Sequence, residues 1–435
     1  MSRAPSPQAN HGSDTWLERD RAHLWHPWAP NRISSETLVI VSGEGCRVWD
    51  ADGRGFLDAK ASGLNATLGY GCRPVIDAVS DQLSRLMTYD MIEGTSVPAI
   101  ELARRIAGLT GPELNRTFFC NSGSEAIEAC VRIARSYHTL SGSSERTQVV
   151  SLRNGYHGTT MAAFAATTGA APEAGFVSLP GPVPPAAPGM GDRGGLDVIR
   201  DHLGEHGRRT AAVLLEPVQG LGGHIVPDEY LWELRKLCDE HGVLMILDEV
   251  MTGFGRTGRM FAYEYADIRP DILATSKGLT AGYASLGAVT TTQRVFDAFE
   301  HDRDVGGLAH GHTHSGHATA CATALAVLDQ LEGAGVLANT QERGRQLLEG
   351  LGAGGVGDTA FVRDLRGRGL LVVVELDSPR RAVRVKQSMQ QDGVLVRRSG
   401  ANIILAPPLV ITAEEVDRVT EAVVAALNSD YVLAI

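Results

Sequence analysis

The amino-acid sequence predicts an α/β protein with a mostly parallel sheet flanked by helices, and a second, smaller α+β domain. Short, almost unbroken apolar runs alternate with amphipathic stretches through the middle of the chain, a pattern typical of a parallel sheet wrapped by helices. The 435 residues, 43% apolar and 21% charged, also exceed what one simple core needs. We therefore expect a soluble globular protein with two closely associated domains.

The central strands are the clearest elements in the sequence. Their apolar character indicates burial on both faces, as in parallel sheets. The runs are Gln148 to Leu152, Ala211 to Pro217, Val243 to Glu249 and Asp271 to Ser276. Between the first two, the Pro- and Gly-rich residues Ala171 to Gly195 predict a surface loop, because strand and helix alternation resumes beyond them.

The two ends of the chain are expected to form the smaller domain. Gly43 to Ala59 alternates apolar residues around Asp52 and Gly53, which indicates a β-hairpin. Beyond Ala318 the sequence predicts a long helix, then a strand, a helix, another strand and a last helix. The predicted divisions are an N-terminal segment over 1–65, a large domain over 66–325 and a C-terminal small domain over 326–435.

The net charge and the cysteine content limit the kinds of binding partner and the cellular compartment that we expect. The formal net charge of -11 argues against nucleic acid, whose binding needs clustered Lys and Arg, and favours small molecules. The six cysteines include no CxxC pair, so neither a zinc site nor a disulfide framework is indicated, and a reducing cytoplasm is expected. The N-terminus has no basic start followed by an apolar run, and no stretch approaches the roughly 18 apolar residues of a membrane helix.

Lysine is rare, which makes one of its positions conspicuous. It occurs only at Lys60, Lys236, Lys277 and Lys386. Lys277 follows an apolar strand and precedes a glycine, so its amine would stand at the carboxyl end of a strand, where open α/β sheets bind ligands. The alternative is an ordinary lysine whose stem lies along apolar surface.

Two further features of the sequence point to a binding site, a carboxylate at the end of a strand and a glycine-containing helix start. Asp248 ends the most apolar run in the chain, and a buried carboxylate there needs a cationic partner, unless it only caps the segment that follows. Asn121 to Ser124 opens a long amphipathic helix with Glu125 in its first turn. Free N–H groups and the helix dipole at such a start favour a phosphate, although capping alone explains many similar starts.

These features together resemble the class III, ω- or ornithine-type, aminotransferases, which are fold type I enzymes dependent on pyridoxal 5′-phosphate. The resemblance covers the chain from about Leu24 to the last helix and is most similar in character to the diaminopelargonate type, which also begins with a stretch like HLWHPW. The matching stretches are WDADGRGFLD, NSGSEAIEACVRIAR, GYHGTT, LLEPVQGLGG, LDEVMTGFGRTG, PDILATSKGLTAGY and HGHTHSGHATACATALAVL.

The resemblance implies a cofactor site in the large domain and an aminotransferase reaction between an amino donor and a carbonyl acceptor. Lys277 would carry the cofactor as a Schiff base and shuttle the proton, and Asp248 would pair with the pyridinium. The remaining cofactor contacts would be Gly123 and Ser124 on the phosphate, Tyr156 and Val250 on the two ring faces, and Thr313 reaching the phosphate of a neighbouring subunit. A homodimer with shared active sites is therefore implied.

Substrate contacts are implied less directly. Trp25 and Trp28 would line the pocket or merely anchor the N-terminal segment, and Arg397, or equally Arg398, would bind a substrate carboxylate. Glu216 would face the substrate without its usual arginine, because Ile404 stands near where relatives have that residue. Further departures are Met251 in place of a glutamine near the cofactor, His314 in place of an aromatic residue and Ala318 in place of a proline.

Other functions remain open from the sequence. Aminomutases and a decarboxylating transaminase share the same constellation, and a binding protein could keep the fold without the chemistry. The GFGRTG run from Gly253 to Gly258 is a literal GxGxxG, but it does not follow its strand directly and no convincing helix follows it. A histidine-rich run suggests a metallohydrolase as the remote alternative, without an HExxH pattern. Its members are His310, His312, His314 and His317.

Overall fold

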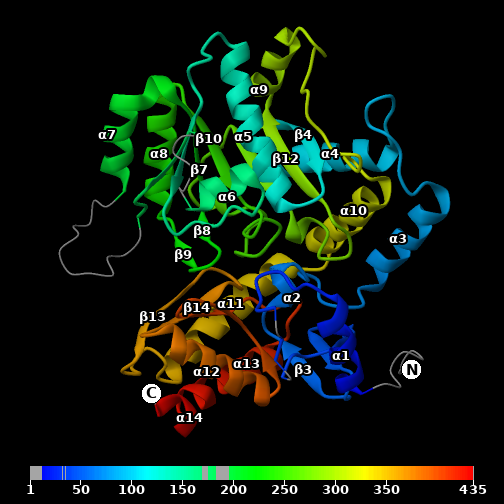
Figure 1. Cartoon of the computed structure of the whole chain (residues 1–435), viewed down its shortest axis with the longest axis vertical. Coiled ribbons are helices and arrows are strands. Elements are labelled where there is room, and N and C mark those ends of the chain that lie inside the picture. The colour runs from blue at the N-terminus through cyan, green and yellow to red at the C-terminus, as the bar shows by residue number, and fades with distance from the viewer. Residues whose placement is uncertain (1–11, 32, 35, 169–174, 183–194, 435) are drawn as a thin grey trace.

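The computed structural model describes residues 12–31, 33–34, 36–168, 175–182 and 195–434. One large sheet with its helices occupies the upper part of the molecule as drawn in Figure 1, and two smaller sheets occupy the lower part. The arrangement agrees with the predicted α/β fold, a mostly parallel sheet accompanied by a smaller α+β part.

The large sheet has seven strands in the order β4-β12-β11-β10-β7-β5-β6. All pairs from β11 to β6 are parallel, whereas β12 runs antiparallel to both neighbours. The strands are β4 (Leu114–Cys120), β12 (Gly287–Thr292), β11 (Ile272–Thr275), β10 (Leu244–Asp248), β7 (Thr210–Leu215), β5 (Gln148–Leu152) and β6 (Phe176–Leu179). Every residue of β7, β10 and β11 is buried, as their apolar sequences predict.

Helices surround this sheet. Helix α5 packs against β7, β10, β11 and β12, and α8 packs against β10. The helices of the upper part are α3 (Arg73–Arg85), α4 (Val97–Thr110), α5 (Gly123–Leu140), α6 (Met161–Thr168), α7 (Leu196–His206), α8 (Asp228–His241), α9 (Gln293–Asp297) and α10 (Ala318–Gly333). A short ribbon of β8 (Val218–Gln219) and β9 (His224–Ile225) lies beside the sheet.

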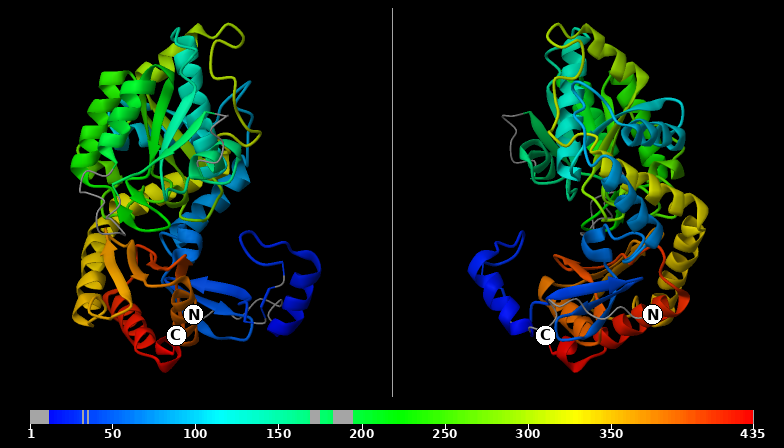
Figure 2. Two further views of the ribbon diagram at one scale, coloured as in Figure 1. Left: turned by 60° about the vertical axis from the view of Figure 1, so that its left-hand side comes forward. Right: turned by 90° about the vertical axis from the view of Figure 1, so that its right-hand side faces the viewer.

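The lower part combines the two ends of the chain, as Figure 2 shows by the blue and the orange to red segments. One sheet has the order β1-β2-β3-β15, in which β15 pairs parallel with β3, and the other has the order β13-β14-β17-β16. The strands are β1 (Ile40–Glu44), β2 (Arg47–Asp50), β3 (Gly55–Asp58), β13 (Val362–Gly367), β14 (Val372–Leu376), β15 (Val394–Leu395), β16 (Arg397–Ser399) and β17 (Asn402–Leu405). The helices are α1 (Ser13–His23), α2 (Ala61–Leu64), α11 (Val336–Ala353), α12 (Pro379–Gln391), α13 (Ala413–Leu427) and α14 (Asp430–Leu433).

The hairpin expected around Asp52 and Gly53 is formed by β2 and β3. The predicted loop from Ala171 to Gly195 is wrong at one point, because Phe176–Leu179 forms β6 and pairs with β5. Such a four-residue strand between Gly and Pro is too short for periodicity to reveal. Residues 171–174 and 183–194 of that stretch lie outside the described residues. The domain boundaries at residues 65 and 325 stay a prediction.

Among the described residues, no single helix is both long and apolar enough to cross a membrane. Helices α10 and α11 meet that criterion only as a pair, by length and composition, and they are bent by 65° at the break between them. Much of α10 is buried in the protein.

Candidate active site at the carboxyl edge of the large sheet

Asp248 ends one strand of the large sheet, and Lys277 follows the neighbouring parallel strand. Strand β10 ends at Asp248, which pairs with Ala274 of β11, and Lys277 comes three residues after Ala274. Because both strands run the same way, their carboxyl ends meet at one edge of the sheet, as expected for an open α/β site. The two side chains interact electrostatically.

The backbone of Lys277 is strained. Its φ is +33°, in the left-handed region that costs a non-glycine residue free energy and that clusters at functional sites. The next residue explains how this conformation is held: a Cβ on Gly278 would lie 3.0 Å from Cβ of Phe254 and 3.1 Å from the carbonyl oxygen of Gly253. The turn after β10 therefore packs directly on the lysine segment, and a side chain at position 278 would be crowded against it.

The amine of Lys277 has no hydrogen-bond or ion-pair partner among the described residues, and the side chain is half-buried. Burial lowers the pKa of this amine, Asp248 and Glu216 oppose that shift, and Arg397 adds to it. A larger share of neutral, nucleophilic amine near neutral pH follows.

Asp248 forms a buried charge pair that the sequence reasoning missed. His157 Nδ1 donates to Asp248 Oδ2 at 2.8 Å, and Val250 N donates to Oδ1 at 3.0 Å. Burial alone would depress the pKa of His157, but the hydrogen bond and negative charge of Asp248, helped by Glu216, raise it overall. The local bond from Val250 matches the capping role considered for Asp248, while His157 supplies the cationic partner. His157 Nε2 is buried and has no hydrogen-bond partner among the described residues.

The start of α5 offers free donors beside this pair. Ser122 Oγ accepts from Glu125 N at 3.2 Å, and Glu125 Oε2 accepts from Asn121 N at 2.7 Å. The N–H groups of Gly123 and Ser124 belong to the first turn and so have no partner inside the helix. A Cβ on Gly123 would lie 2.7 Å from Val250 Cγ1, so glycine is required where the two elements meet.

The loop after β5 contacts both the start of α5 and the buried Glu216. Ser124 Oγ accepts from Thr159 N at 3.1 Å, and Gly158 is needed there because its φ is +128° and a Cβ would lie 2.4 Å from Ser124 Oγ. Tyr156 donates its backbone N–H to Glu216 Oε2 at 2.8 Å and leaves its ring half-exposed. Tyr156 is therefore bound to Glu216, whose charge interacts with those of His157 and Asp248.

Glu216 is a buried carboxylate without an arginine. Its side chain accepts from Tyr156 N and Gly220 N, both at 2.8 Å, and the groups that interact with its charge include His157, Asp248 and Lys277. Burial raises its pKa to about 7. The two departures expected nearby, Met251 and Ile404, belong to one apolar cluster that also contains Leu64.

The two candidate arginines differ in setting. Arg397 is half-buried, has no hydrogen-bond or ion-pair partner among the described residues, and interacts with the charge of Lys277. Arg398 is exposed and donates from Nη1 to the carbonyl of Gly400 at 2.9 Å. Alternate residues of a strand face opposite ways, so only Arg397 of β16 is directed to the site.

Some predicted contacts lie at the surface of the single chain. Trp25 is 84% exposed and Trp28 is 80% exposed, and the Trp28 ring lies edge-on to Tyr156 with the centroids 6.4 Å apart. Neither tryptophan is packed into the core as an anchor. Thr313 and His314 are exposed in a turn.

The competing motifs do not form sites of their own. Residues 253–258 form turns without a following phosphate-facing helix, and Arg256 within them is fully buried. No group of three or more His, Cys, Asp or Glu side chains suited to a metal ion occurs in the described part of the chain. His310 and His312 lie against the ring of Phe118.

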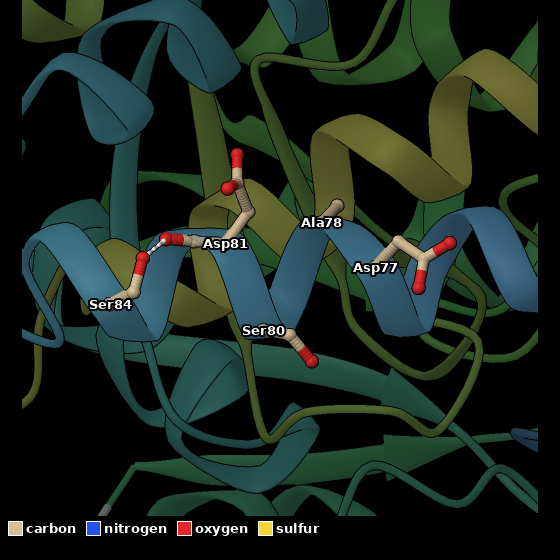
Figure 3. A pocket seen from close by; sticks show the side chains of 5 residues that line it. All are labelled: Asp77, Ala78, Ser80, Asp81 and Ser84. Carbon is tan, nitrogen blue, oxygen red and sulfur yellow. Dashed lines mark hydrogen bonds between the residues drawn. The ribbon is translucent and has the colours of Figure 1, made fainter.

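A surface hollow on α3 is unrelated to this edge of the sheet. Figure 3 shows that all the side chains lining it come from this one helix. They are Asp77, Ala78, Ser80, Asp81 and Ser84. Both carboxylates are already paired along the helix, Asp77 with Arg73 and Asp81 with Arg85, so the hollow gives no argument for a second site.

The family model for class-III aminotransferases matches residues 29–427. This chain is a class-III aminotransferase. The aminotransferase is 36% identical to the adenosylmethionine-8-amino-7-oxononanoate aminotransferase of Geobacter sulfurreducens, over 94% of this chain and 96% of that protein. It is 34% identical to the taurine–pyruvate aminotransferase of Rhodobacter capsulatus, over 98% and 99%. A PLP-bound amine transaminase from an uncultivated Pseudomonas species superposes with a TM-score of 0.86 at 36% identity, over 93% and 98%.

The aminotransferase accordingly transfers an amino group from a small-molecule donor to a carbonyl acceptor with pyridoxal phosphate. The residues of the site fit this cofactor. The free N–H groups of Gly123 and Ser124 suit a phosphate. The buried Asp248 suits a protonated ring nitrogen. The unpartnered amine of Lys277 suits an aldehyde. The alternatives of a mutase, a metallohydrolase and an inactive binding protein are not favoured.

Proposed function

We propose that Lys277 is the residue that binds the cofactor aldehyde and, once released by the amino donor, carries the proton away from the donor's amine-bearing carbon. One observation carries this proposal: an unpartnered, half-buried amine stands at the sheet edge beside Asp248, on a strained backbone. When bound, pyridoxal phosphate supplies an electron sink for the bonds at that carbon. The lowered pKa of Lys277 supports its service as a base.

We infer further that the surrounding residues orient the cofactor. Asp248, backed by His157, holds the proton on the ring nitrogen, because the buried carboxylate favours the cationic form. The N–H groups of Gly123 and Ser124 bind the phosphate, and Tyr156 and Val250, both half-exposed, contact the two ring faces. Together these residues fix the ring against Lys277.

The test of the lysine uses a matched pair of variants. Reduction of the cofactor-loaded enzyme with borohydride, followed by peptide mass spectrometry, should find the phosphopyridoxyl group on Lys277. Lys277→Ala should lose that label and at least about 10³-fold in kcat. Lys236→Ala is the control, because Lys236 pairs with Glu233 and lies over the Trp232 ring. Label on another lysine, or full activity of Lys277→Ala, would refute the assignment.

We propose that substrates present a carboxylate to Arg397. Its half-buried guanidinium has no partner in the described chain, and it interacts with the charge of Lys277, so a bound carboxylate would satisfy it. We propose that Glu216, Trp25 and Trp28 also contact the substrate, supported by the interaction of Glu216 with the charge of Lys277 and by the ring contact of Trp28 with Tyr156. The two named relatives act on different donors, so the donor and acceptor of this enzyme are to be identified by a panel of amines scored in the half-reaction.

We propose that the enzyme is a homodimer in which Thr313 reaches the phosphate site of the partner. Support comes from exposed apolar side chains next to the Thr313 turn. Met87 is 62% exposed, Ile92 92% and Val97 73%. The carbonyl of Met87 accepts from Thr319 N, which links this segment to the end of the turn. Light scattering should give twice the chain mass, and Ile92→Asp with Val97→Asp should shift it toward the monomer and weaken cofactor binding.

We propose that the enzyme works in the cytoplasm. All six cysteines lie in the described chain and are free thiols, and five of them are buried. Unpaired cysteines are typical of proteins that stay in a reducing compartment. Cell fractionation with an antibody to the native protein would test this location.

A further inference from the structure

The turn between β8 and β9 joins the small sheet to the carboxylate of Glu216. This turn spans residues 220–223. At its start, Gly220 N donates to Glu216 Oε1 at 2.8 Å. Further along, the carbonyl of Gly222 accepts from Nε and Nη2 of Arg366, at 2.9 and 2.5 Å. Arg366 belongs to β13, which lies in the lower part of the molecule and packs against β9 (Figure 1). One short turn therefore connects the lower part of the molecule to the site.

Strand register places Arg366 on the face of the small sheet that carries Arg397. Arg366 of β13 stands opposite Val373 of β14, which stands opposite Ile404 of β17. Ile404 in turn stands opposite Arg397 of β16. Directly opposite residues of antiparallel strands have their side chains on one face, so this row faces one way. Val373 and Ile404 pack in the apolar cluster that contains Met251, which follows β10. The row therefore faces the large sheet, with one arginine at each end.

The guanidinium of Arg366 is held from its other side by the small sheet. Nη1 donates to Asp364 Oδ2 at 2.8 Å and to Glu375 Oε2 at 2.6 Å, and the side chain is only 11% exposed. His224 Nε2 lies 3.4 Å from Nη2. Burial and the charge of Arg366 lower the pKa of His224 against the opposing carboxylates, so this imidazole is neutral near neutral pH. These contacts fix the guanidinium so that its remaining edge meets the Gly222 carbonyl.

The turn fits closely against both parts of the molecule. Gly223 has a φ of +62°, and a Cβ there would lie 2.4 Å from Val373 Cγ2 of the small sheet. A Cβ on Gly220 would lie 2.7 Å from Met251 Sδ and 3.2 Å from Glu216 Oε1. A shift at one end of so tightly packed a turn would therefore displace the other end.

The hydrogen bond from Gly220 affects the charge of Glu216. Burial raises the pKa of Glu216 to about 7, and Asp248 adds to the rise. His157 and the N–H groups of Tyr156 and Gly220 oppose it, because they stabilise the ionised form. Loss of the Gly220 bond would therefore leave less negative charge on Glu216 near neutral pH.

We propose that Arg366 is a positioning residue of the reaction, which holds the turn after β8 in place and, through it, the Glu216 carboxylate that interacts with Lys277. The inference rests on the proposed role of Lys277 and extends its surroundings into the small sheet. Arg366 acts through the turn and not by its own charge. The charged groups that shift the pKa of Lys277 are Asp248, Glu216 and Arg397.

The first test follows the pH dependence of the rate at which the cofactor-free full-length protein captures pyridoxal phosphate. Arg366→Met should shift the inflection to lower pH by roughly half a unit, because a less charged Glu216 lets Lys277 lose its proton more readily. Removal of a nearby positive charge alone would shift it to higher pH, so the direction separates the two effects. Arg366→Lys, which keeps the charge and can still donate to the Gly222 carbonyl, should restore most of the parent profile.

A double variant tests whether the effect passes through Glu216. Glu216→Gln should itself lower the inflection, and Arg366→Met added to it should cause no further shift. Arg368→Met is the matched control. Arg368 lies two residues away and also joins the two parts of the molecule, but at α8, where it donates to both carboxylate oxygens of Asp228 at 2.9 and 3.3 Å. This control should keep the parent inflection.

The second test observes the turn itself. Hydrogen exchange is measured by mass spectrometry on the cofactor-loaded enzyme, in peptides that cover residues 217–224. The amides of the turn should exchange at least about tenfold faster in Arg366→Met than in the parent, because the turn is no longer held. Arg368→Met should keep the parent rate. This measurement depends on neither turnover nor the capture rate.

A milder variant covers the case in which Arg366→Met does not fold. Asn402 Nδ2 donates to the carbonyl of Leu221 in the same turn at 3.4 Å, and its Oδ1 accepts from Arg366 Nη2 at 3.4 Å. Asn402→Ala should therefore shift the inflection the same way, by less, and speed exchange in the turn.

The outcomes separate this inference from the function on which it rests. If Glu216→Gln does not move the inflection, the proposed role of Lys277 is contradicted and the inference with it. A shift in Glu216→Gln without one in the Arg366 and Asn402 variants would overturn the inference alone, even if exchange in the turn were faster. A full second shift in the double variant would overturn it too, because the effect would then bypass Glu216.

Discussion

The two sides of the site differ in whether their charged groups have partners within the chain. On the side of the large sheet, the carboxylates are buried and hydrogen-bonded, as Asp248 is by His157. On the side of the small sheets, the cation Arg397 is half-buried and lacks an acidic partner within the described chain. A cofactor that stays bound is best held by side chains that are already fixed in place before it binds. A substrate that enters and leaves can instead be bound by a charged side chain that has no partner until the substrate arrives.

The largest effect is expected on the paired side. Asp248→Ala removes the buried carboxylate and leaves His157 without its partner, so kcat/KM should fall roughly 10³-fold. The Kd of the cofactor, measured by fluorescence titration of the cofactor-free protein, should rise as well. A variant with normal cofactor affinity and turnover would contradict the pairing of Asp248 with the ring nitrogen.

On the unpaired side the effect should depend on the substrate. Arg397→Met should lower kcat/KM for 5-aminopentanoate, an amine with a terminal carboxylate, about 10-fold to 100-fold. This is the loss expected when one half-buried hydrogen bond between charged groups is removed. Arg398→Met should have a smaller effect, confined to low salt, because that side chain is exposed. Equal losses in the two variants would show that the distinction between the faces of β16 is wrong.

Two buried glutamates allow a sharper comparison. Glu216 and Glu249 both have a pKa raised to about 7 by burial, and both accept from backbone N–H groups, but only Glu216 interacts with the charge of Lys277. Glu216→Gln removes a negative charge that favours the ammonium form, so the pKa of Lys277 should fall further. The pH dependence of the rate at which the cofactor-free protein captures pyridoxal phosphate should shift to lower pH.

Two further variants serve as controls in the same experiment, one expected to leave the pKa of Lys277 unchanged and one expected to raise it. Glu249→Gln should leave the inflection in place, since Glu249 is not among the groups that shift the pKa of Lys277. Arg397→Met should move it to higher pH, because Arg397 lowers that pKa. A shift in Glu249→Gln as large as that in Glu216→Gln would remove the basis of the comparison.

The smallest effect concerns stability. Glu249 accepts from Ala262 N, Tyr263 N and the Thr252 hydroxyl, and burial raises its pKa from 4.5 to about 7. The folded protein then holds a proton that the unfolded chain has released, so stability falls as pH rises from about 4.5 to about 7 and changes little above that range. The drop in Tm between pH 5 and pH 8 should be smaller in Glu249→Gln than in the parent. An equal drop would mean that Glu249 does not contribute to it.

The sequence by itself determined the sheet and the reactive edge. Short unbroken apolar runs that alternate with amphipathic stretches indicate strands buried on both faces; Asp248 ends one of them, and Lys277 closely follows another. Gly123 and Gly278 lie where another segment packs closely, but the residues that pack there, Val250 and Phe254, are distant in the sequence.

Tertiary structure alone decided which side chains meet. His157 lies 91 residues from Asp248, and Arg397 lies more than 100 residues from Lys277, with whose charge it interacts, so no local pattern pairs them. The choice of Arg397 over Arg398 likewise depends on which face of β16 turns to the site, which the register with β17 fixes. The physical reason is that periodicity reports burial, whereas electrostatic pairing depends on distances that only the folded chain establishes.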